Sequence, residues 1–333
     1  MRKAIVTGGM GFIGKHVVSQ LLQKGFRVLV LDNFETTESH YHEGVDFRQI
    51  SQNQTSLILP QNAVGVVRVD LKLASENDIK RLINGYGYIF HLAALPRVEP
   101  SIEDPVPHHL SNALISLKLM KAAKDLGIKK FIFSSSSSVY GDPEVTPTTE
   151  GSGLDPMSPY ALQKLICEQY LDLFHKLYDF NSVSLRYFNV YGAGQPTKGS
   201  YIPVMGIFFR QRLNGQHLTI TGDGSQTRDF VNVEDVAKAN VAAALSNLPD
   251  GHNVYNIASG KNYSIKEIAQ AISPKVRIAP PRFEPHTTLG DVSKAREAFK
   301  WSEKNPSTGE EEEYRWEPTV DLMDWIEENR PKN

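Results

Sequence analysis

The sequence has one cysteine, Cys167, among its 333 residues, and no apolar run approaches the length that crosses a bilayer. A lone cysteine has no partner for an internal disulfide, which fits a reducing compartment. The apolar part of the opening MRKAIVTGG is too short for a signal peptide, so we expect a cytoplasmic protein without a membrane partner. The formal net charge of −2 argues against a nucleic-acid partner, which requires a broad basic face.

Short apolar runs alternate with helical patterns in the first half of the chain. The runs predict strands at Lys3–Thr7, Val28–Asp32, Val66–Asp70, Tyr88–His91, Phe131–Ser134 and Ser182–Arg186. The patterns predict helices at Ile13–Lys24, Glu76–Ile83, Ala113–Asp125 and Pro159–Tyr178. Near-continuous apolar strands that alternate with helices indicate a parallel sheet covered on both faces. The predicted fold class is therefore α/β, with a doubly wound parallel sheet of the Rossmann type.

The composition changes after about residue 190, where proline, glycine and shorter elements become frequent. We predict a first domain at residues 1–180 and a smaller C-terminal α/β substrate-binding lobe at 181–333. Residues 229–260 of this lobe are expected to pack back on the first domain. They include one further predicted helix at 234–246, EDVAKANVAAALS.

Two polar segments interrupt the pattern of strands and helices. Residues 35–63 are polar and patternless, which is long for a loop, so we expect an excursion or lid outside the sheet. Residues 302–315, SEKNPSTGEEEEYR, are acidic and polar, and we expect a solvated insertion there.

A glycine-rich stretch, TGGMGFIG at 7–14, lies between the first predicted strand and the first predicted helix. Glycines there let the backbone turn tightly and approach a pyrophosphate, to which the helix N-terminus offers free N–H groups. Asp32, eighteen residues beyond Gly14, ends the second strand and can accept hydrogen bonds from the adenosine ribose. Because its carboxylate would repel a 2′-phosphate, the pattern predicts NAD rather than NADP. Asp70 and Leu71, at the end of the third predicted strand, could contact the adenine. The alternatives are a tight turn without a ligand for the glycines and a simple strand end for Asp70 and Leu71.

Five consecutive serines, Ser134 to Ser138, follow the apolar run Phe131–Phe133. Such a row usually indicates a flexible linker. Here it begins at the carboxyl end of a predicted parallel strand, which is where the ligand crevice of such a sheet lies. We therefore expect hydroxyl groups of this row to face a ligand.

Tyr160 and Lys164 lie four residues apart in SPYALQK, so they share one face of the predicted helix. A tyrosine hydroxyl has a pKa near 10, which burial raises and nearby positive charge lowers. Lowering this pKa by about three units takes about 4 kcal/mol, which Lys164 and the oxidised nicotinamide ring of NAD would supply together. The pair therefore predicts a catalytic base, with an ordinary surface pair as the alternative.

Four motifs together resemble the extended short-chain dehydrogenase/reductase family, namely TGGMGFIG, HLAA at 91–94, the serine row with VYG, and SPYALQK. RYFNVYG at 186–192 and GDGSQTRDFVNVEDVA at 222–237 are similar to its nucleotide-sugar branch, in particular to UDP-glucose and UDP-N-acetylglucosamine 4-epimerases. The resemblance extends to about residue 296. It implies an NAD-dependent isomerase of nucleotide-sugar metabolism and polysaccharide biosynthesis. It also implies a homodimer through the helices around 113–125 and 159–178.

The resemblance also implies three groups of site residues. Ser136, Tyr160 and Lys164 would be catalytic, with Ser136 bridging Tyr160 and the reacting sugar hydroxyl. The residues implied at the cofactor are Gly8, Gly11, Phe12, Ile13, Asp32, Asn33, Asp70, Leu71, Leu92, Ala93, Ala94, Asn112, Ser134, Tyr160, Lys164 and Phe188. The residues implied at the UDP-sugar are Ser136, Asn189, Arg228, Arg282 and Thr288, and no metal ligand is implied.

The serine row separates the activities within this branch. Elimination of water needs a carboxylic acid to protonate the leaving hydroxyl, and related dehydratases carry Asp-Glu where this chain has Ser137 and Ser138. The resemblance therefore implies epimerisation of a UDP-sugar at C4 through a 4-keto intermediate, with hydride passing to tightly bound NAD and back. The alternatives are a UDP-glucuronate 4-epimerase or decarboxylase, another nucleotide-sugar dehydratase or reductase, and an inactive NAD-sensing regulatory protein.

A few positions bear on the choice of sugar. Arg228 suits a diphosphate because a guanidinium binds phosphate in bidentate fashion, with an ion pair to Asp229 as the alternative. Arg282 lies in RFEP, where relatives have Arg-Pro-Gly-Asp. Thr288 falls where the family gates the 2-substituent, and its small side chain implies acceptance of UDP-GlcNAc and UDP-GalNAc. Arg97 departs from the family pattern, and faces either a C6 carboxylate, as in UDP-glucuronate, or solvent.

Overall fold

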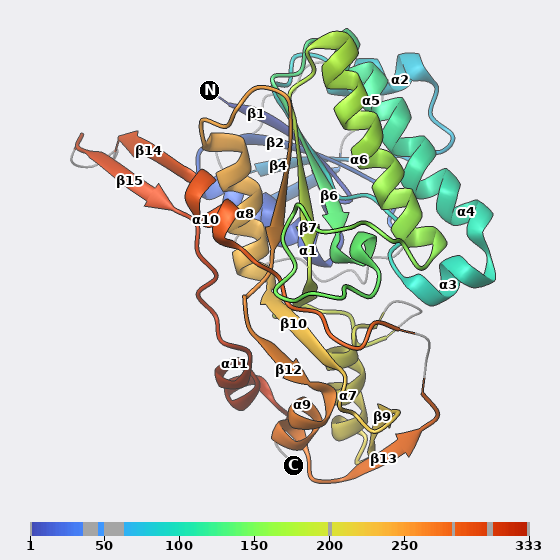
Figure 1. Cartoon of the computed structure of the whole chain (residues 1–333). Helices are drawn as coiled ribbons and strands as arrows, with labels where there is room; N and C mark the ends of the chain where they lie inside the picture. Colours follow the sequence, from blue (N-terminus) through green and yellow to red (C-terminus); the bar gives the residue numbers. More distant parts are fainter. Residues whose placement is uncertain are drawn as a thin grey trace.

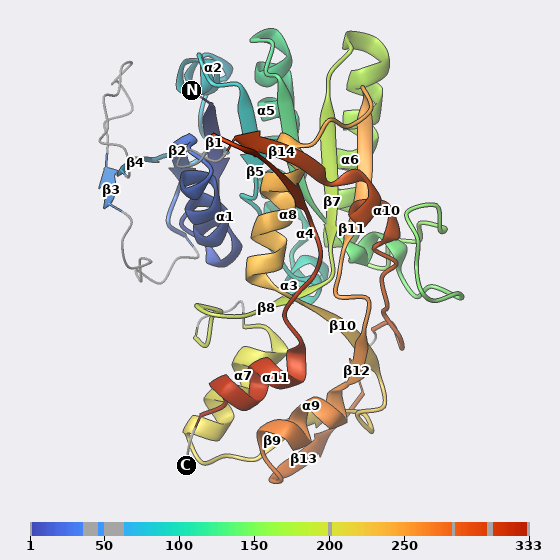
Figure 2. The same cartoon turned by 90° about the vertical axis from the view of Figure 1, so that its left-hand side faces the viewer.

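The computed structural model describes residues 2–35, 46–49, 63–198, 202–281, 284–304 and 309–331. Its largest element is a sheet of eight parallel strands with helices on both faces (Figures 1 and 2). The strand order is β11-β7-β6-β5-β1-β2-β4-β3. The strands are β1 (Lys3–Thr7), β2 (Arg27–Asp32), β3 (Asp46–Gln49), β4 (Ala63–Arg68), β5 (Tyr88–His91), β6 (Lys130–Ser136), β7 (Ser182–Tyr187) and β11 (His252–Ile257).

Each face of this sheet has its own apolar core. One core includes Val17 and Val241, from the helices α1 (Phe12–Gln23) and α8 (Val233–Leu245). The other includes Ile79, Leu119 and Leu171, from the helices α2 (Glu76–Ile83), α5 (Ile115–Asp125) and α6 (Pro159–Tyr178). Cys167 is buried in this second core. The arrangement confirms the predicted α/β fold with a doubly wound parallel sheet.

Several predicted elements have the observed bounds, namely β1, β5, α2 and α6. Local signals determine the start of α6, because Ser158 accepts a hydrogen bond of 3.2 Å from the backbone N–H of Ala161 and Pro159 follows it. The helix predicted at Ala113–Asp125 is α5 (Ile115–Asp125), which begins two residues later than predicted. A π-helical turn, η1 (Leu110–Leu114), precedes α5, and two short helices, α3 (Val98–Glu103) and α4 (Pro105–His109), precede that turn.

The prediction that residues 35–63 lie outside the sheet is wrong for Asp46–Gln49. These residues form β3, which pairs in parallel with β4 at the edge of the large sheet. A short edge strand pairs along one side only and needs no long apolar run, so the apolar pattern does not reveal it. The remainder of the segment, at 36–45 and 50–62, lies outside the described residues.

A smaller lobe lies beyond the carboxyl ends of the large sheet, in the lower half of Figures 1 and 2. It contains a three-stranded sheet of β8 (Asn189–Tyr191), β10 (Thr227–Asn232) and β12 (Asn262–Ser264) and a pair of β9 (Leu218–Thr221) and β13 (Val276–Ala279). Its helices are α7 (Val204–Leu213), α9 (Ile265–Ile272) and α11 (Leu322–Asn329), which share a third apolar core. Although β7, α8 and β11 follow residue 180, they belong with the large sheet, and the predicted domain division at 180 stays a prediction.

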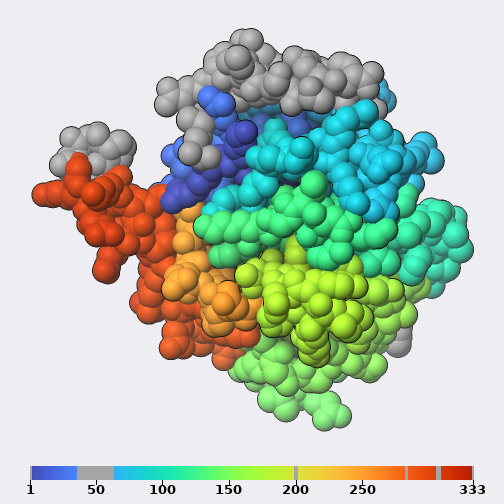
Figure 3. Space-filling view, turned by 90° about the horizontal axis from the view of Figure 1, so that it is seen from above, coloured from blue at the N-terminus to red at the C-terminus, as the bar shows by residue number. Residues whose placement is uncertain are grey.

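The acidic segment near the end of the chain forms part of a hairpin. After α10 (Ser293–Ala298), strands β14 (Lys300–Lys304) and β15 (Glu311–Arg315) pair and extend away from the body of the molecule, as Figure 3 shows. Trp301 stacks on Tyr314 with ring centroids 5.3 Å apart, and the ammonium of Lys24 lies 3.7 Å from the Tyr314 centroid. The predicted solvated insertion therefore has regular structure, although the side chains of Glu311 and Glu313 are exposed.

None of the helices in the described ranges is both long and apolar enough to span a membrane.

Candidate active site

A cleft with a volume of about 760 Å³ lies between the carboxyl ends of the large sheet and the smaller lobe. Gly8, Asp32 and Tyr160 line it from the side of the sheet, and Asn189 and Arg228 line it from the lobe. The loops that follow β1 and β2 and the carboxyl end of β6 all reach this cleft, as expected at the carboxyl edge of a parallel sheet.

The glycines after β1 bring the loop backbone into close contact with its neighbours. Gly8 has a φ of +68°, and a Cβ at this position would lie 2.7 Å from the backbone nitrogen of Ala93. A Cβ on Gly14 would lie 2.1 Å from the carbonyl oxygen of Gly8. Helix α1 then starts at Phe12 with Gly11 as its N-cap, and no side chain caps its first N–H groups. The loop and helix start therefore fit a pyrophosphate, which accepts hydrogen bonds from such groups.

Asp32 is buried at the end of β2 and lines the same cleft. Its carboxylate accepts hydrogen bonds from the backbone N–H groups of Met10, at 3.0 Å, and Phe34, at 2.7 Å. Burial raises the pKa of Asp32, and these two hydrogen bonds together with Lys15 partly offset the effect. The glycine loop and this carboxylate therefore fit the dinucleotide NAD, since the carboxylate disfavours a further phosphate on the ribose.

The serine row ends β6 and meets the start of α6. The ammonium of Lys164 is buried and donates a hydrogen bond of 2.7 Å to the carbonyl oxygen of Ser134. It lies 5.9 Å from the ring centroid of Tyr160, one helical turn earlier. Tyr160 is anchored through its backbone N–H, which donates to the hydroxyl of Ser101 at 3.1 Å. The side chain of Ser136 interacts with the phenol of Tyr160 and lowers the pKa of that phenol.

Burial determines the protonation of both residues. It raises the pKa of Tyr160, and the interaction with the side chain of Ser136 only partly offsets this. It lowers the pKa of Lys164 to about 8. The side chains of the protein alone therefore keep the phenol protonated at neutral pH. Positive charge beyond that of Lys164 is needed to make Tyr160 a base.

The structure brings most of the predicted site residues to the cleft. Those that line it are Gly8, Gly11, Phe12, Ile13, Asp32, Asn33, Asp70, Leu71, Leu92, Ala93, Ala94, Ser134, Tyr160, Lys164, Asn189 and Arg228. Four others lie outside the set of described residues that line the cleft, namely Asn112, Ser136, Phe188 and Thr288. Arg282 lies outside the described part of the chain.

The residues behind the wall of the cleft hold its lining in place. The side-chain amide of Asn112 bonds both the N–H and the carbonyl oxygen of Leu95, at 2.8 and 3.1 Å. Phe188 is buried next to Gly290, where an added Cβ would lie 2.8 Å from its ring. The hydroxyl of Thr288 accepts a hydrogen bond of 3.2 Å from the backbone N–H of Asp229. Sequence reasoning does not separate such supporting positions from lining positions, because both lie at the ends of the same elements.

Arg228 forms its ion pair with a residue that the sequence analysis missed. Its Nη2 atom lies 2.9 Å from the carboxylate of Glu284, which also lines the cleft. The alternative of an ion pair with Asp229 is wrong, because that carboxylate accepts hydrogen bonds from Ser259, Gly260 and Gly290. Burial raises the pKa of Asp229 to about 6. The departure from the family pattern in the stretch before Pro285 was the available signal for Glu284.

Arg97 lies in the wall of the cleft. Its backbone has a φ of 104°, which is uncommon for a residue other than glycine. Its guanidinium donates a hydrogen bond of 2.5 Å to the carbonyl oxygen of Ile202, just before α7. Of the two orientations left open by the sequence, the structure therefore supports the one toward the cleft.

The chain is similar to known proteins along most of its length. The sequence model of the NAD dependent epimerase/dehydratase family matches residues 4–258. A UDP-glucose 4-epimerase from Mycolicibacterium smegmatis is 32% identical over 327 residues, which cover 97% of this chain and 96% of the relative.

Two solved structures extend this similarity to the fold. The UDP-N-acetylglucosamine 4-epimerase from Methanobrevibacter ruminantium, in complex with UDP-N-acetylmuramic acid, is 36% identical with a TM-score of 0.77 over 88% of this chain and 90% of the other. The Thermus thermophilus UDP-glucose 4-epimerase, in complex with NAD, is 31% identical with a TM-score of 0.78 over 98% and 96% of the two chains.

Proposed function

From the NAD-dependent epimerase/dehydratase family, to which this chain belongs, we propose that the enzyme interconverts UDP-sugars by epimerisation at C4. The substrate pairs are UDP-GlcNAc and UDP-GalNAc, UDP-glucose and UDP-galactose, or both. One observation carries this proposal, namely that Tyr160, Lys164 and the first two residues of the serine row, Ser134 and Ser135, meet beside the glycine loop in a single cleft. The cofactor of this NAD-dependent enzyme would be held by Gly8, Gly11, Phe12 and Asp32, which line the cleft.

The residues of the chain divide the work of the reaction among them. When bound, NAD would accept the hydride from C4 of the sugar and, in its reduced form, would return it to C4. Tyr160 takes the proton of the C4 hydroxyl and later returns it to the same oxygen. Ser136, which interacts with the phenol of Tyr160, holds the reacting hydroxyl. Lys164 contributes a buried positive charge that favours the phenolate.

The lobe binds the nucleotide diphosphate and leaves the sugar free to turn. Asn189 and Arg228 line this side of the cleft and, with Arg282, hold the diphosphate. Thr288 leaves room for an N-acetyl group at C2. These roles are proposals for the individual residues, supported by the position of the first two in the cleft wall.

The residues after Ser136 argue for epimerisation and against elimination. Ser137 and Ser138 stand in the 3₁₀ turn η2 (Ser137–Tyr140), so this turn offers hydroxyl groups and no carboxylic acid. Without an acid there, a sugar hydroxyl lacks a proton donor for its departure as water. We therefore expect the 4-keto intermediate to be reduced again, so that the product has every hydroxyl group of the substrate.

A second candidate substrate follows from Arg97. Its position in the cleft wall supports an ion pair with a carboxylate at C6 of the sugar, and a guanidinium binds a carboxylate in bidentate fashion. The enzyme would then be a UDP-glucuronate 4-epimerase. R97A separates the two candidates, because it would raise KM for UDP-glucuronate alone if Arg97 binds the carboxylate.

The test of the proposed function is a set of product assays with the purified full-length enzyme. UDP-GlcNAc, UDP-glucose and UDP-glucuronate are incubated separately, and the products are resolved by chromatography. We expect a C4 epimer from at least one of them, without net consumption of NADH or release of CO₂. Release of CO₂ identifies a decarboxylase and stoichiometric NADH consumption a reductase, whereas unchanged sugars in every assay reject catalysis and leave an NAD-sensing protein.

We also propose that the enzyme is a homodimer. Exposed leucines lie on the neighbouring elements η1 and α6, with Leu110 at 41%, Leu173 at 45% and Leu177 at 59% exposure. Apolar side chains exposed together on adjacent helices fit the self-complementary patch of a two-fold dimer. Light scattering should give twice the 37.2 kDa chain mass, and L173E/L177E should give the monomer mass. The single buried thiol of Cys167 supports our proposal of a cytoplasmic location.

A further inference from the structure

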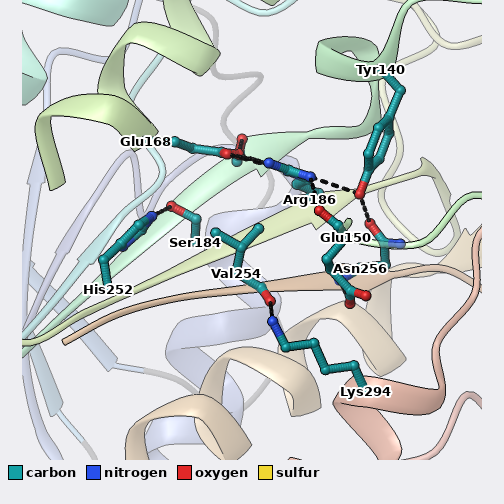
Figure 4. Close-up of polar contacts among 10 residues, drawn as sticks. Tyr140, Glu150, Glu168, Ser184, Arg186, His252, Val254, Asn256 and Lys294 are labelled. Carbon is teal, nitrogen blue, oxygen red and sulfur yellow. Dashed lines mark hydrogen bonds and ion pairs between the residues drawn. The ribbon is translucent and has the colours of Figure 1, made fainter. Parts of the chain in front are cut away.

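An ion pair is buried directly behind the serine row. Glu168 of α6 and Arg186 of β7 have side chains that are 5% and 4% exposed, and their closest nitrogen and oxygen atoms are 2.6 Å apart. The Nε atom of Arg186 donates a second hydrogen bond to the same carboxylate at 3.0 Å, so the pair is bidentate (Figure 4). Neither residue is among the described residues that line the cleft. The reaction itself therefore gives this pair no direct role.

Glu168 connects the ion pair to the catalytic residues. It lies one helical turn after Lys164, and its carboxylate accepts a hydrogen bond of 2.5 Å from the hydroxyl of Ser135. Ser135 stands opposite Arg186 in the pairing of β6 with β7. It also stands between Ser134, whose carbonyl oxygen accepts a hydrogen bond from Lys164, and Ser136, whose side chain interacts with the phenol of Tyr160 and lowers its pKa. One carboxylate thus anchors the backbone on which both catalytic contacts depend.

Arg186 connects the same pair to the far side of the site. Its Nη1 atom donates a hydrogen bond of 2.8 Å to the hydroxyl of Tyr140, which donates to the side-chain oxygen of Asn256 at 2.7 Å (Figure 4). The amide nitrogen of Asn256 then donates to the carbonyl oxygen of Thr148 at 2.9 Å. The backbone N–H of Thr148 donates to the carbonyl oxygen of Leu289, next to the proposed gate at Thr288. These hydrogen bonds therefore connect the serine row, by way of Thr148, to the segment that contains Thr288.

We propose that Glu168 and Arg186 are positioning residues, which act through Ser135 to hold Ser136 and Lys164 in the geometry that activates Tyr160. This inference rests on the proposed epimerase function. The hydrogen bonds from Ser135 to Glu168 and from Lys164 to Ser134 hold the serine row in one arrangement, together with the bidentate ion pair of Glu168. A row of small polar residues would otherwise have several arrangements. A displacement of about 1 Å at a catalytic group lowers a rate by about 100-fold, so the effect of the pair is measurable in turnover.

The decisive variant is S135A, which removes one hydroxyl and leaves the ion pair intact. We expect kcat to fall by at least about tenfold, with KM for the UDP-sugar unchanged, because only the alignment of the catalytic groups is affected. The acidic limb of the pH profile of kcat should move upward by about one pH unit, because a displaced Lys164 stabilises the phenolate of Tyr160 less well. E168Q should show the same two changes more strongly, and S135A decides the matter if E168Q does not fold.

S184A is the matched control. Ser184 is a fully buried serine on β7 that faces His252, at 3.4 Å, and has no hydrogen bond to the ion pair (Figure 4). We expect S184A to keep the kcat and the pH profile of the unchanged enzyme. The proposal is overturned if S135A keeps the wild-type kcat within twofold and the wild-type pH profile, or if S184A shows the same losses. Failure of the epimerase function itself would appear earlier, as wild-type enzyme that forms no epimer from any substrate.

Discussion

The ammonium of Lys164 donates a hydrogen bond of 2.7 Å to the carbonyl oxygen of Ser134, which fixes a buried cation to the strand that ends in the serine row. Burial lowers the pKa of Lys164 to about 8, so the charged form is held against a cost of desolvation. The protein therefore maintains at its proposed catalytic centre a charge that weakens the folded state. This arrangement leads to a prediction about stability as well as one about activity.

K164M should make the protein more stable and inactive. A fall in the pKa of Lys164 from 10.5 to about 8 destabilises the wild type by roughly 3 kcal/mol at pH 7, and K164M removes this cost. The variant also loses the hydrogen bond to Ser134, which destabilises it by about 2 kcal/mol. We therefore expect the free energy of unfolding to rise by about 1 kcal/mol in K164M. The unfolded chain keeps its proton up to higher pH than the folded one. The wild type therefore gains stability as the pH rises from 8 toward 10.5, and the advantage of K164M shrinks.

Urea unfolding at pH 7 and pH 9.5 measures this difference in the free energy of unfolding. K176M is the control, since Lys176 lies on the exposed face of the same helix and pairs with Asp172. A K164M protein that is less stable than the wild type at both pH values would contradict the prediction.

Y160F should lower kcat by about 10³-fold, because the variant removes the group that exchanges the C4 proton and leaves the ring in place. Binding of NAD and UDP should change little. The measurement is the rate of epimer formation, with nucleotide content determined on the same preparations. Y178F, on the exposed end of the same helix, should behave as the wild type. If Y160F retains a tenth of the turnover, Tyr160 is not the base.

E284Q should bind UDP about tenfold more tightly than the wild type. The carboxylate of Glu284 lies 2.9 Å from Arg228 and competes with a diphosphate for the same guanidinium. Removing its charge leaves Arg228 available to the ligand and removes a repulsion between anions. Calorimetric titration with UDP gives the Kd, and E327Q, on an exposed part of α11, controls for net charge. Unchanged affinity would mean that Arg228 does not bind the diphosphate.

D32N should weaken the binding of NAD by about tenfold and narrow the preference for NAD over NADP. The asparagine side chain keeps the size of Asp32 but presents one acceptor oxygen, whereas the aspartate accepts from both Met10 and Phe34. It also removes the negative charge that disfavours a 2′-phosphate. Titrations of nucleotide-free enzyme with NAD and with NADP measure both effects, and an unchanged ratio of the two affinities would refute the role of Asp32.

Local sequence signals were enough to predict much of the large sheet and its helices. The bounds of α6 follow from Ser158, Pro159 and the apolar period after them, and the glycine loop follows from its spacing between a strand and a helix. Those signals act within a few residues of each other. They hold for any chain in which strand, turn and helix follow in order, which is why the fold class was predictable.

Contacts between distant parts of the chain could not be predicted in this way. The ion pairs of Arg228 with Glu284 and of Glu168 with Arg186 form only after separate elements have packed together. Glu168 does follow Lys164 by one helical turn, which places it on the face toward β6. The sequence around Glu168 gives no indication of its partner Arg186 on β7. Likewise β3 is recognised only by its pairing with β4.

One of the two edge strands of the large sheet, β11, affects how the protein folds while it is being synthesised. It pairs with β7 along all six of its residues, yet the segment that forms β8, α7, β9, β10 and α8 comes between the two strands in the chain. During translation, β7 therefore leaves the ribosome well before its neighbour and exposes an open edge to solvent, to chaperones and to other nascent chains. The edge of β7 stays open at least until β11, which ends at Ile257, has been synthesised.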